Sequence, residues 1–132
     1  MKIRWTRQSL RLRISPSEMS RLLAGEEITE TLMVSSIGGK SWSATLAPAM
    51  ETGLELEKGS LRLTLSPSDR ERLVAPEVEG VYFETRESPS LRYYVEKDFP
   101  CAHPGPPEAK ELPEETFAPP KGFKERHGAA SE

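Results

Sequence analysis

Hydrophobic and polar residues alternate in two short stretches that are almost identical in sequence. Residues 9–15 read Ser-Leu-Arg-Leu-Arg-Ile-Ser, and residues 60–66 read Ser-Leu-Arg-Leu-Thr-Leu-Ser. An alternation with a period of two predicts a β-strand that has one buried face and one face in water. The leucines and the isoleucine would point into a core, and the arginines and the threonine would point outward.

Each of these strands runs into a Ser-Pro-Ser segment that ends in an acidic residue, Glu18 or Asp69. Ser15 and Ser66 are suited to cap a helix, because a serine oxygen can accept a hydrogen bond from the free amide three residues later. Proline is favourable at the first helical position, and a carboxylate at the third can bond back to the cap. The pattern predicts two short helices, over residues 16–24 and 67–75. Their expected apolar stripes are formed by Met19, Leu22, Leu23, Leu73 and Val74.

The similarity covers most of the chain. Residues 3–24 align with residues 54–75 at an offset of 51, and residues 32–46 align with residues 81–95 at an offset of 49. Each copy reads strand, strand, helix, strand, strand. We therefore predict an α+β fold of two internally duplicated ββαββ units, with about eight mostly antiparallel strands in a curved sheet or barrel and two short helices. The expected domain comprises residues 1–99, with repeats at about 2–48 and 53–99.

Residues 100–132 differ from the rest of the chain in composition. They contain seven of the twelve prolines and few apolar residues. Such a segment cannot bury enough apolar surface to offset the entropy of ordering it. We therefore predict an extended or disordered tail.

Composition and charge limit the possible function classes. No apolar run approaches the roughly 18 residues of a membrane span, and the first residues lack the pattern of a signal peptide. The single cysteine excludes an internal disulfide and favours a reducing, cytoplasmic location. The net charge of −3 argues against nucleic acid as a partner.

The outward positions of the first hairpin form the first candidate site. All four are cationic: Lys2, Arg4, Arg11 and Arg13. Such a patch could bind phosphate or an acidic partner. The structural alternative is that the first strands of the two repeats pair, so that Lys2 and Arg4 face Glu55 and Glu57 and fix the register. We expect no aromatic residue on this face to stack bases, which argues further against nucleic acid.

Two tyrosines form the second candidate site. Tyr82 and Tyr94 fall on the opposite face of their strands from Phe83 and Tyr93, so one of these pairs is expected to be exposed. Exposed aromatic residues are typical of protein-contact surfaces. Tyr82 and Tyr94 are therefore candidate contacts for a partner protein, and the chain itself is expected to be a monomer or a homodimer.

Cys101 and His103 form a Cys-x-His motif that could supply two ligands to zinc, or a thiolate beside a base. A closed zinc site needs about four ligands, and the only other histidine, His127, is far along the chain. The alternative is that Cys101 packs as a small apolar residue where the last strand ends. We predict no catalytic set, no cofactor and no complete metal site.

Two segments resemble a family of small bacterial proteins that is catalogued as a domain of unknown function. The first segment, Lys2–Ser15, is similar to the beginning of these proteins, and the second, Val95–Cys101, is similar to their last strand. The resemblance covers about residues 1–101 and implies no activity, so it supplies no catalytic residues. We therefore expect a non-enzymatic binding or adaptor domain that contacts a protein. The alternative is a small anion- or phosphate-binding protein or enzyme that uses the arginine-rich sheet face.

Overall fold

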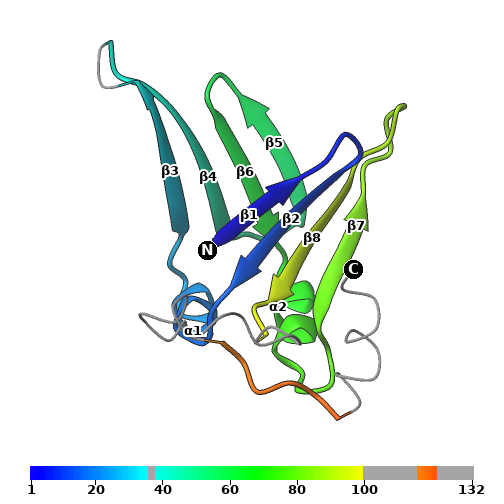
Figure 1. Cartoon of the computed structure of the whole chain (residues 1–132). Coiled ribbons are helices and arrows are strands. Elements are labelled where there is room, and N and C mark those ends of the chain that lie inside the picture. The colour runs from blue at the N-terminus through cyan, green and yellow to red at the C-terminus, as the bar shows by residue number, and fades with distance from the viewer. Residues whose placement is uncertain (36–37, 100–115, 122–132) are drawn as a thin grey trace, which may run out of the picture.

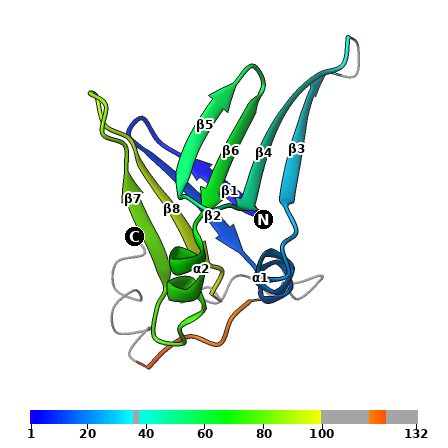
Figure 2. The ribbon, with the colours of Figure 1, turned by 180° about the vertical axis from the view of Figure 1, so that it is seen from behind.

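Two four-stranded β-sheets diverge from the end of the molecule where the two helices lie (Figure 1; Figure 2). This computed structural model describes residues 1–35, 38–99 and 116–121. The elements in chain order are β1 (Lys2–Trp5), β2 (Ser9–Ile14), α1 (Pro16–Leu23), β3 (Ile28–Ser35), β4 (Lys40–Pro48), β5 (Gly53–Glu57), β6 (Ser60–Leu65), α2 (Pro67–Val74), β7 (Gly80–Glu84) and β8 (Arg92–Lys97).

The two sheets have equivalent strand orders. Sheet A has the order β1-β2-β8-β7, and sheet B, read from the matching edge, has the order β5-β6-β4-β3. The central pair of each sheet is parallel, β2 with β8 and β6 with β4, and the outer pairs are antiparallel. Each sheet therefore combines the first hairpin of one ββαββ unit with the second hairpin of the other.

The register follows the same equivalence. Leu10 lies opposite Tyr93 in sheet A, and Leu61 lies opposite Ala44 in sheet B. Residues 51 apart in the first hairpins and the helices, or 49 apart in the second hairpins, occupy corresponding places, and we call them equivalent positions. The predicted α+β class with eight strands and two helices is confirmed. In the described part of the chain the strands form two open sheets rather than a closed barrel.

The core lies between the inner faces of the two sheets. Buried and partly exposed residues alternate along both β2 and β6, as their sequences predict. Leu12 and Leu63, which are equivalent, are both fully buried at the centre. Burying one such side chain stabilises a fold by about 1.5–3 kcal/mol, so the two units contribute symmetrically to one interior.

Both helices begin as predicted. Ser15 Oγ accepts a hydrogen bond from the Glu18 amide, and the Glu18 carboxylate accepts one from the Ser15 amide. In α2, Ser66 Oγ accepts a hydrogen bond from the Asp69 amide. These bonds satisfy amide groups that the first turn of a helix leaves unpaired.

Each helix buries a narrower stripe than its sequence predicts. Leu22 and Leu73 are fully buried, but Leu23 is 47% exposed and Val74 is 43% exposed. Successive residues of a helix point about 100° apart, so neighbours in sequence cannot both face the sheets. The prediction that Leu23 and Val74 belong to the apolar stripes is wrong for this reason.

Phe117, which belongs to the predicted tail, packs against the domain. Its ring centroid lies 6.0 Å from that of Phe99, and its amide donates a hydrogen bond to the Asp98 carbonyl at 2.8 Å. The ammonium of the buried Lys97 lies 5.8 Å from the same ring. The other residues of the predicted tail, except 116–121, lie outside the described residues.

Candidate functional site

The outer face of sheet A brings together cationic and tyrosine side chains that are far apart in the sequence. The register aligns two rows across the sheet, the first formed by Arg4, Arg11, Tyr94 and Tyr82 and the second by Lys2, Arg13 and Glu96. We call these seven residues the Arg–Tyr face. Both residue groups that the sequence singles out, the first-hairpin cations and the two tyrosines, therefore belong to one surface.

Glu96 is at the centre of the polar contacts on this face. Its Oε1 lies 3.0 Å from Arg11 Nε and 3.7 Å from Arg13 Nε, and its Oε2 accepts a hydrogen bond from the Tyr82 hydroxyl at 3.0 Å. One carboxylate of β8 thus orients three side chains from two other strands, β2 and β7. Glu96 is not among the candidate residues predicted from the sequence, although the alternation along β8 places it on the same face as Tyr94.

The Arg11 guanidinium is oriented without being fully hydrogen-bonded. Its central carbon lies 5.7 Å from the centre of the Tyr94 ring, within the range of a cation–π interaction. Its buried Nε is at ion-pair distance from Glu96, but no acceptor meets the geometry of a hydrogen bond with it. Its contact with Glu96 is therefore chiefly a charge interaction.

Tyr82 is half-exposed and keeps its proton. Its ring lies edge-on to Tyr94, with centroids 5.1 Å apart, and 51% of the residue is exposed. Burial of the hydroxyl and the nearby Glu96 carboxylate raise the pKa of Tyr82 well above its ordinary value of 10.0. The hydroxyl is therefore a hydrogen-bond donor throughout the physiological pH range.

The predicted pairing of Lys2 and Arg4 with Glu55 and Glu57 is wrong. β1 is an edge strand of sheet A and β5 is an edge strand of sheet B, because each first hairpin pairs with the second hairpin of the other unit. Lys2 instead lies 2.9 Å from the Asp98 carboxylate. Arg4 makes no ion pair with any residue that the structure describes.

The expectation that no aromatic residue shares the cationic face is also wrong. Tyr94 lies directly beside Arg11, because β8 of the second unit pairs in parallel with β2 of the first. The sequence gives no local signal for a parallel pairing between strands so far apart in the chain. The structure therefore makes the two separate candidate sites one candidate site.

The equivalent face of sheet B has different chemistry. Glu55 and Thr64 occupy the positions that Arg4 and Arg13 occupy in sheet A. Of the four cationic positions of the first hairpin, only that of Arg11 has a cation at the equivalent position of sheet B, which is Arg62. The Arg62 guanidinium lies 2.6 Å from the carboxylate of Glu27, in the loop after α1. Sheet B thus provides an internal comparison for the Arg–Tyr face.

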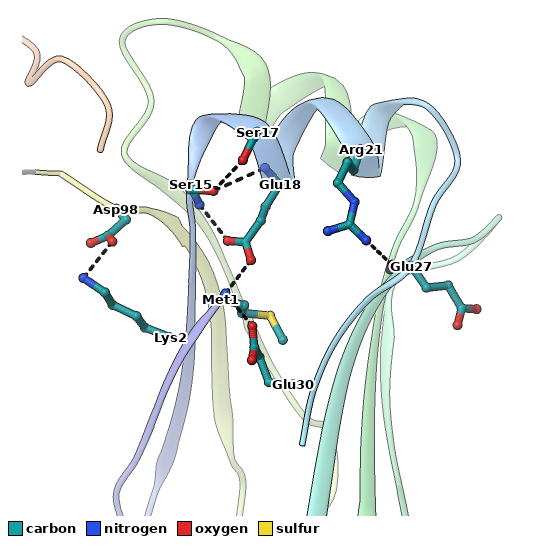
Figure 3. A network of polar contacts seen from close by, with 9 residues as sticks. All are labelled: Met1, Lys2, Ser15, Ser17, Glu18, Arg21, Glu27, Glu30 and Asp98. Carbon is teal, nitrogen blue, oxygen red and sulfur yellow. Dashed lines mark hydrogen bonds and ion pairs between the residues drawn. The ribbon is translucent and has the colours of Figure 1, made fainter. Parts of the chain in front are cut away.

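A second polar site lies at the start of α1, where a pocket of about 390 Å³ opens (Figure 3). The Met1 ammonium contacts the Glu18 carboxylate and donates a hydrogen bond to Glu30 Oε1 at 2.9 Å. In the second unit, the hydroxyl of Thr52 contacts the Asp69 carboxylate in the equivalent place. The Met1 ammonium pairs with Glu18 of α1 and Glu30 of β3, and these contacts connect the start of β1 to α1 and β3.

The ion pair in this pocket shifts the pKa of both partners. Burial by itself disfavours the Met1 ammonium, but the hydrogen bonds to Glu18 and Glu30 outweigh it and raise its pKa above 8.0. Burial also disfavours the Glu18 carboxylate, but the ammonium and the helix-cap amide outweigh it and lower the pKa of Glu18 below 4.5. Both groups are therefore charged at neutral pH.

An apolar groove of about 370 Å³ opens between the inner faces of the sheets. Its lining strands diverge toward the end of the molecule away from the helices (Figure 1). Trp5 and Trp42 line it with ring centroids 5.7 Å apart, and Leu10, Leu61 and Leu91 line it as well. Trp5 lies on the inner face, but it is 63% exposed because the sheets diverge there. This groove is not among the sites predicted from the sequence.

Comparison with known families identifies the chain's relatives. The model of a family of unknown function, DUF7009, matches residues 1–120. The chain belongs to this family. The DUF7009 match includes both helices, all eight strands and Phe117. No curated protein and no solved structure matches the chain significantly.

The Cys-x-His motif of this DUF7009 chain stays a prediction. Cys101 and His103 lie outside the described residues. Within the described segments, no three His, Cys, Asp or Glu side chains are grouped so that they could hold a metal ion. None of the helices described there has the length and apolar character needed to cross a bilayer.

Proposed function

We propose that this DUF7009 chain is a non-enzymatic binding domain whose Arg–Tyr face docks an acidic segment of a partner protein. The observation that supports this proposal is the meeting of four cationic and two tyrosine side chains on one sheet face. Interfaces between proteins are enriched in arginine and tyrosine, because these side chains combine a large contact area with hydrogen-bond donors.

Charge complementarity favours an acidic partner. The outward residues of sheet A include five cationic side chains if Arg92 is counted, against the carboxylates of Glu84, Glu96 and the adjacent Asp98. This local excess of positive charge occurs on a chain whose net charge is −3. Arg4 has a planar guanidinium with no described ionic partner, which suits it to bind a carboxylate through two parallel hydrogen bonds.

The same face is less suited to nucleic acid. Carboxylates are interleaved with the cations, and they would repel a phosphate backbone. Tyr82 packs edge-on against Tyr94 and donates its hydroxyl to Glu96, so neither ring is arranged as a free stacking platform for bases. A segment that alternates acidic and apolar residues would satisfy both the arginines and the exposed tyrosine ring.

Binding of a labelled peptide of alternating glutamate and leucine, followed by fluorescence anisotropy with the full chain, tests the proposal. We expect Arg4→Glu to weaken binding about tenfold or more, because it replaces an attraction by a repulsion. Arg62→Glu makes the same chemical change on the outer face of sheet B and should leave the affinity within about twofold.

Two results would contradict the proposal. An equal loss of affinity in both variants would show that the peptide senses only the overall charge of the chain. A stronger response to inorganic phosphate or to a single-stranded oligonucleotide than to the peptide would favour the anion-binding alternative. Circular dichroism spectra of both variants that match the wild type would show that the substitutions did not unfold the domain.

A further inference from the structure

The apolar groove at the open end leaves large side chains in water. Trp5 is 63% exposed, and Leu32, which also lines the groove, is 56% exposed. Exposed apolar surface is unfavourable in water, and burying it stabilises a complex by roughly 25 cal/mol per Å². A concave, mainly apolar site with a few polar groups is the usual form of a small-ligand pocket.

We infer that this groove binds a small, uncharged, mainly apolar molecule. The eight described residues that line it carry no charge, although charged residues make up 30% of the chain. Its volume of about 370 Å³ falls within the range of about 300–1,000 Å³ that is typical of ligand pockets. The hydroxyl groups of Thr6 and Ser9, which also line the groove and lie 2.7 Å apart, could orient one polar group of the ligand.

The size of the groove favours a small molecule over a protein. A specific protein interface needs about 20–30 residues and about 800 Å² on each partner, far more than eight lining residues supply. The same argument disfavours a second copy of the chain as the occupant. The inference is independent of the Arg–Tyr face, because the groove belongs to the inner faces of the sheets.

The chain carries its own reporter for this site. Its only two tryptophans, Trp5 and Trp42, both line the groove. Octanol, octanoate and octylammonium can therefore be compared as probes through the quenching of tryptophan emission by acrylamide. We expect octanol to shield the tryptophans, and its affinity to exceed that of hexanol about fourfold for each added methylene. The two charged probes should bind about tenfold more weakly, because burying a charge here has no compensating partner.

Two neighbouring residues of β3 provide matched variants. Leu32 lies on the inner face opposite Trp42, and Met33, which is 63% exposed, lies on the outer face. Leu32→Asp should lower the affinity for octanol about tenfold or more, whereas Met33→Asp should leave it unchanged. Both positions are exposed, so both variants are expected to fold.

Several outcomes would overturn the inference. Equal effects of the two substitutions, or equal binding of all three probes, would show that octanol does not use the groove. Tryptophans that are already shielded from acrylamide in dilute protein would show that another part of the chain fills it. Shielding that appears only as the protein concentration rises would show that a second copy covers it.

Discussion

The inner faces of the two sheets are alike, whereas their outer faces are not. Leu12 and Leu63 occupy equivalent inner positions and are equally buried. On the outer face of sheet B, Thr29 and Thr45 hydrogen-bond to each other at 2.8 Å, and the Thr64 hydroxyl donates to the Glu51 carbonyl at 2.9 Å. These hydroxyl groups are satisfied within the sheet, whereas sheet A presents arginines and a half-exposed tyrosine.

The difference between the outer faces is the reason for proposing that one sheet, and not the other, binds a partner. A shared interior keeps equivalent inner positions mainly apolar, even where their size differs as at Ala44 and Tyr93, because burying an unpaired polar group is costly. Outer positions have no such restriction, so their chemistry reflects what each face contacts. Arg4 and Arg13 stand where sheet B has Glu55 and Thr64, and the proposal that sheet A binds a partner rests on this difference.

The largest expected effect tests the similarity of the two interiors. Leu12→Ala and Leu63→Ala each remove a fully buried side chain from an equivalent position. We expect each substitution to lower the free energy of unfolding by about 2–5 kcal/mol, and the two losses to be similar. Urea denaturation measures both. Separate transitions for the two halves would contradict a shared core.

A smaller effect distinguishes the two helix starts. Glu18→Gln removes one of the two carboxylate partners of the Met1 ammonium, and Asp69→Asn makes the equivalent change beside the uncharged Thr52. We expect each to cost on the order of 1 kcal/mol at neutral pH, because a hydrogen bond to a charged group is lost. Only Glu18→Gln should also alter the alkaline side of the pH–stability profile.

The pKa shifts give the direction of this pH dependence. The pKa of Glu18 is lowered by folding, so its contribution is present above about pH 4.5 and is lost as the pH falls through the folded value. The pKa of the Met1 ammonium is raised, so its contribution is present below about pH 8.0 and is lost as the pH rises through the folded value. Thermal unfolding across this pH range would measure both contributions. An unchanged alkaline profile in Glu18→Gln would contradict the ion pair between Glu18 and the Met1 ammonium.

Glu96→Gln tests the arrangement that is specific to sheet A. Loss of the carboxylate removes the charge that disfavours the Tyr82 phenolate, so the pKa of Tyr82 should fall. The free energy of unfolding should decrease by about 1 kcal/mol, because Arg11 and Arg13 lose their shared counter-charge. Ultraviolet titration, compared with that of Tyr82→Phe, would assign the shift. An unchanged tyrosine titration would mean that Glu96 does not contact Tyr82 in solution.

The smallest expected effect lies on sheet B. Arg62 pairs with the exposed Glu27, and solvent screens such a pair so that it contributes little to stability. Arg62→Ala should therefore leave the denaturation midpoint nearly unchanged, and added salt should remove any remaining difference. Chemical denaturation at low and high salt checks this. A loss as large as that of Glu96→Gln would remove the distinction between the two faces.

The sequence predicts the local structure of this protein well, because local structure follows local patterns. The alternation around Leu12 predicts β2, and the serine, proline and acidic residues at Ser15–Glu18 predict the start of α1. The pairing of β2 with β8 has no such signal, because it joins strands of different units. For that reason the sequence alone does not place Tyr94 beside Arg11. It does not predict the exposure of Trp5 either.

The central claim is that sheet A, and not sheet B, is the binding face. Its most direct test is a nuclear magnetic resonance titration of the isotope-labelled chain with the acidic peptide. The account predicts that amide signals of β1, β2, β7 and β8 shift, with Arg4 and Tyr82 among the most affected, while those of β3 to β6 stay in place. Shifts spread equally over both sheets, or confined to sheet B, would contradict it.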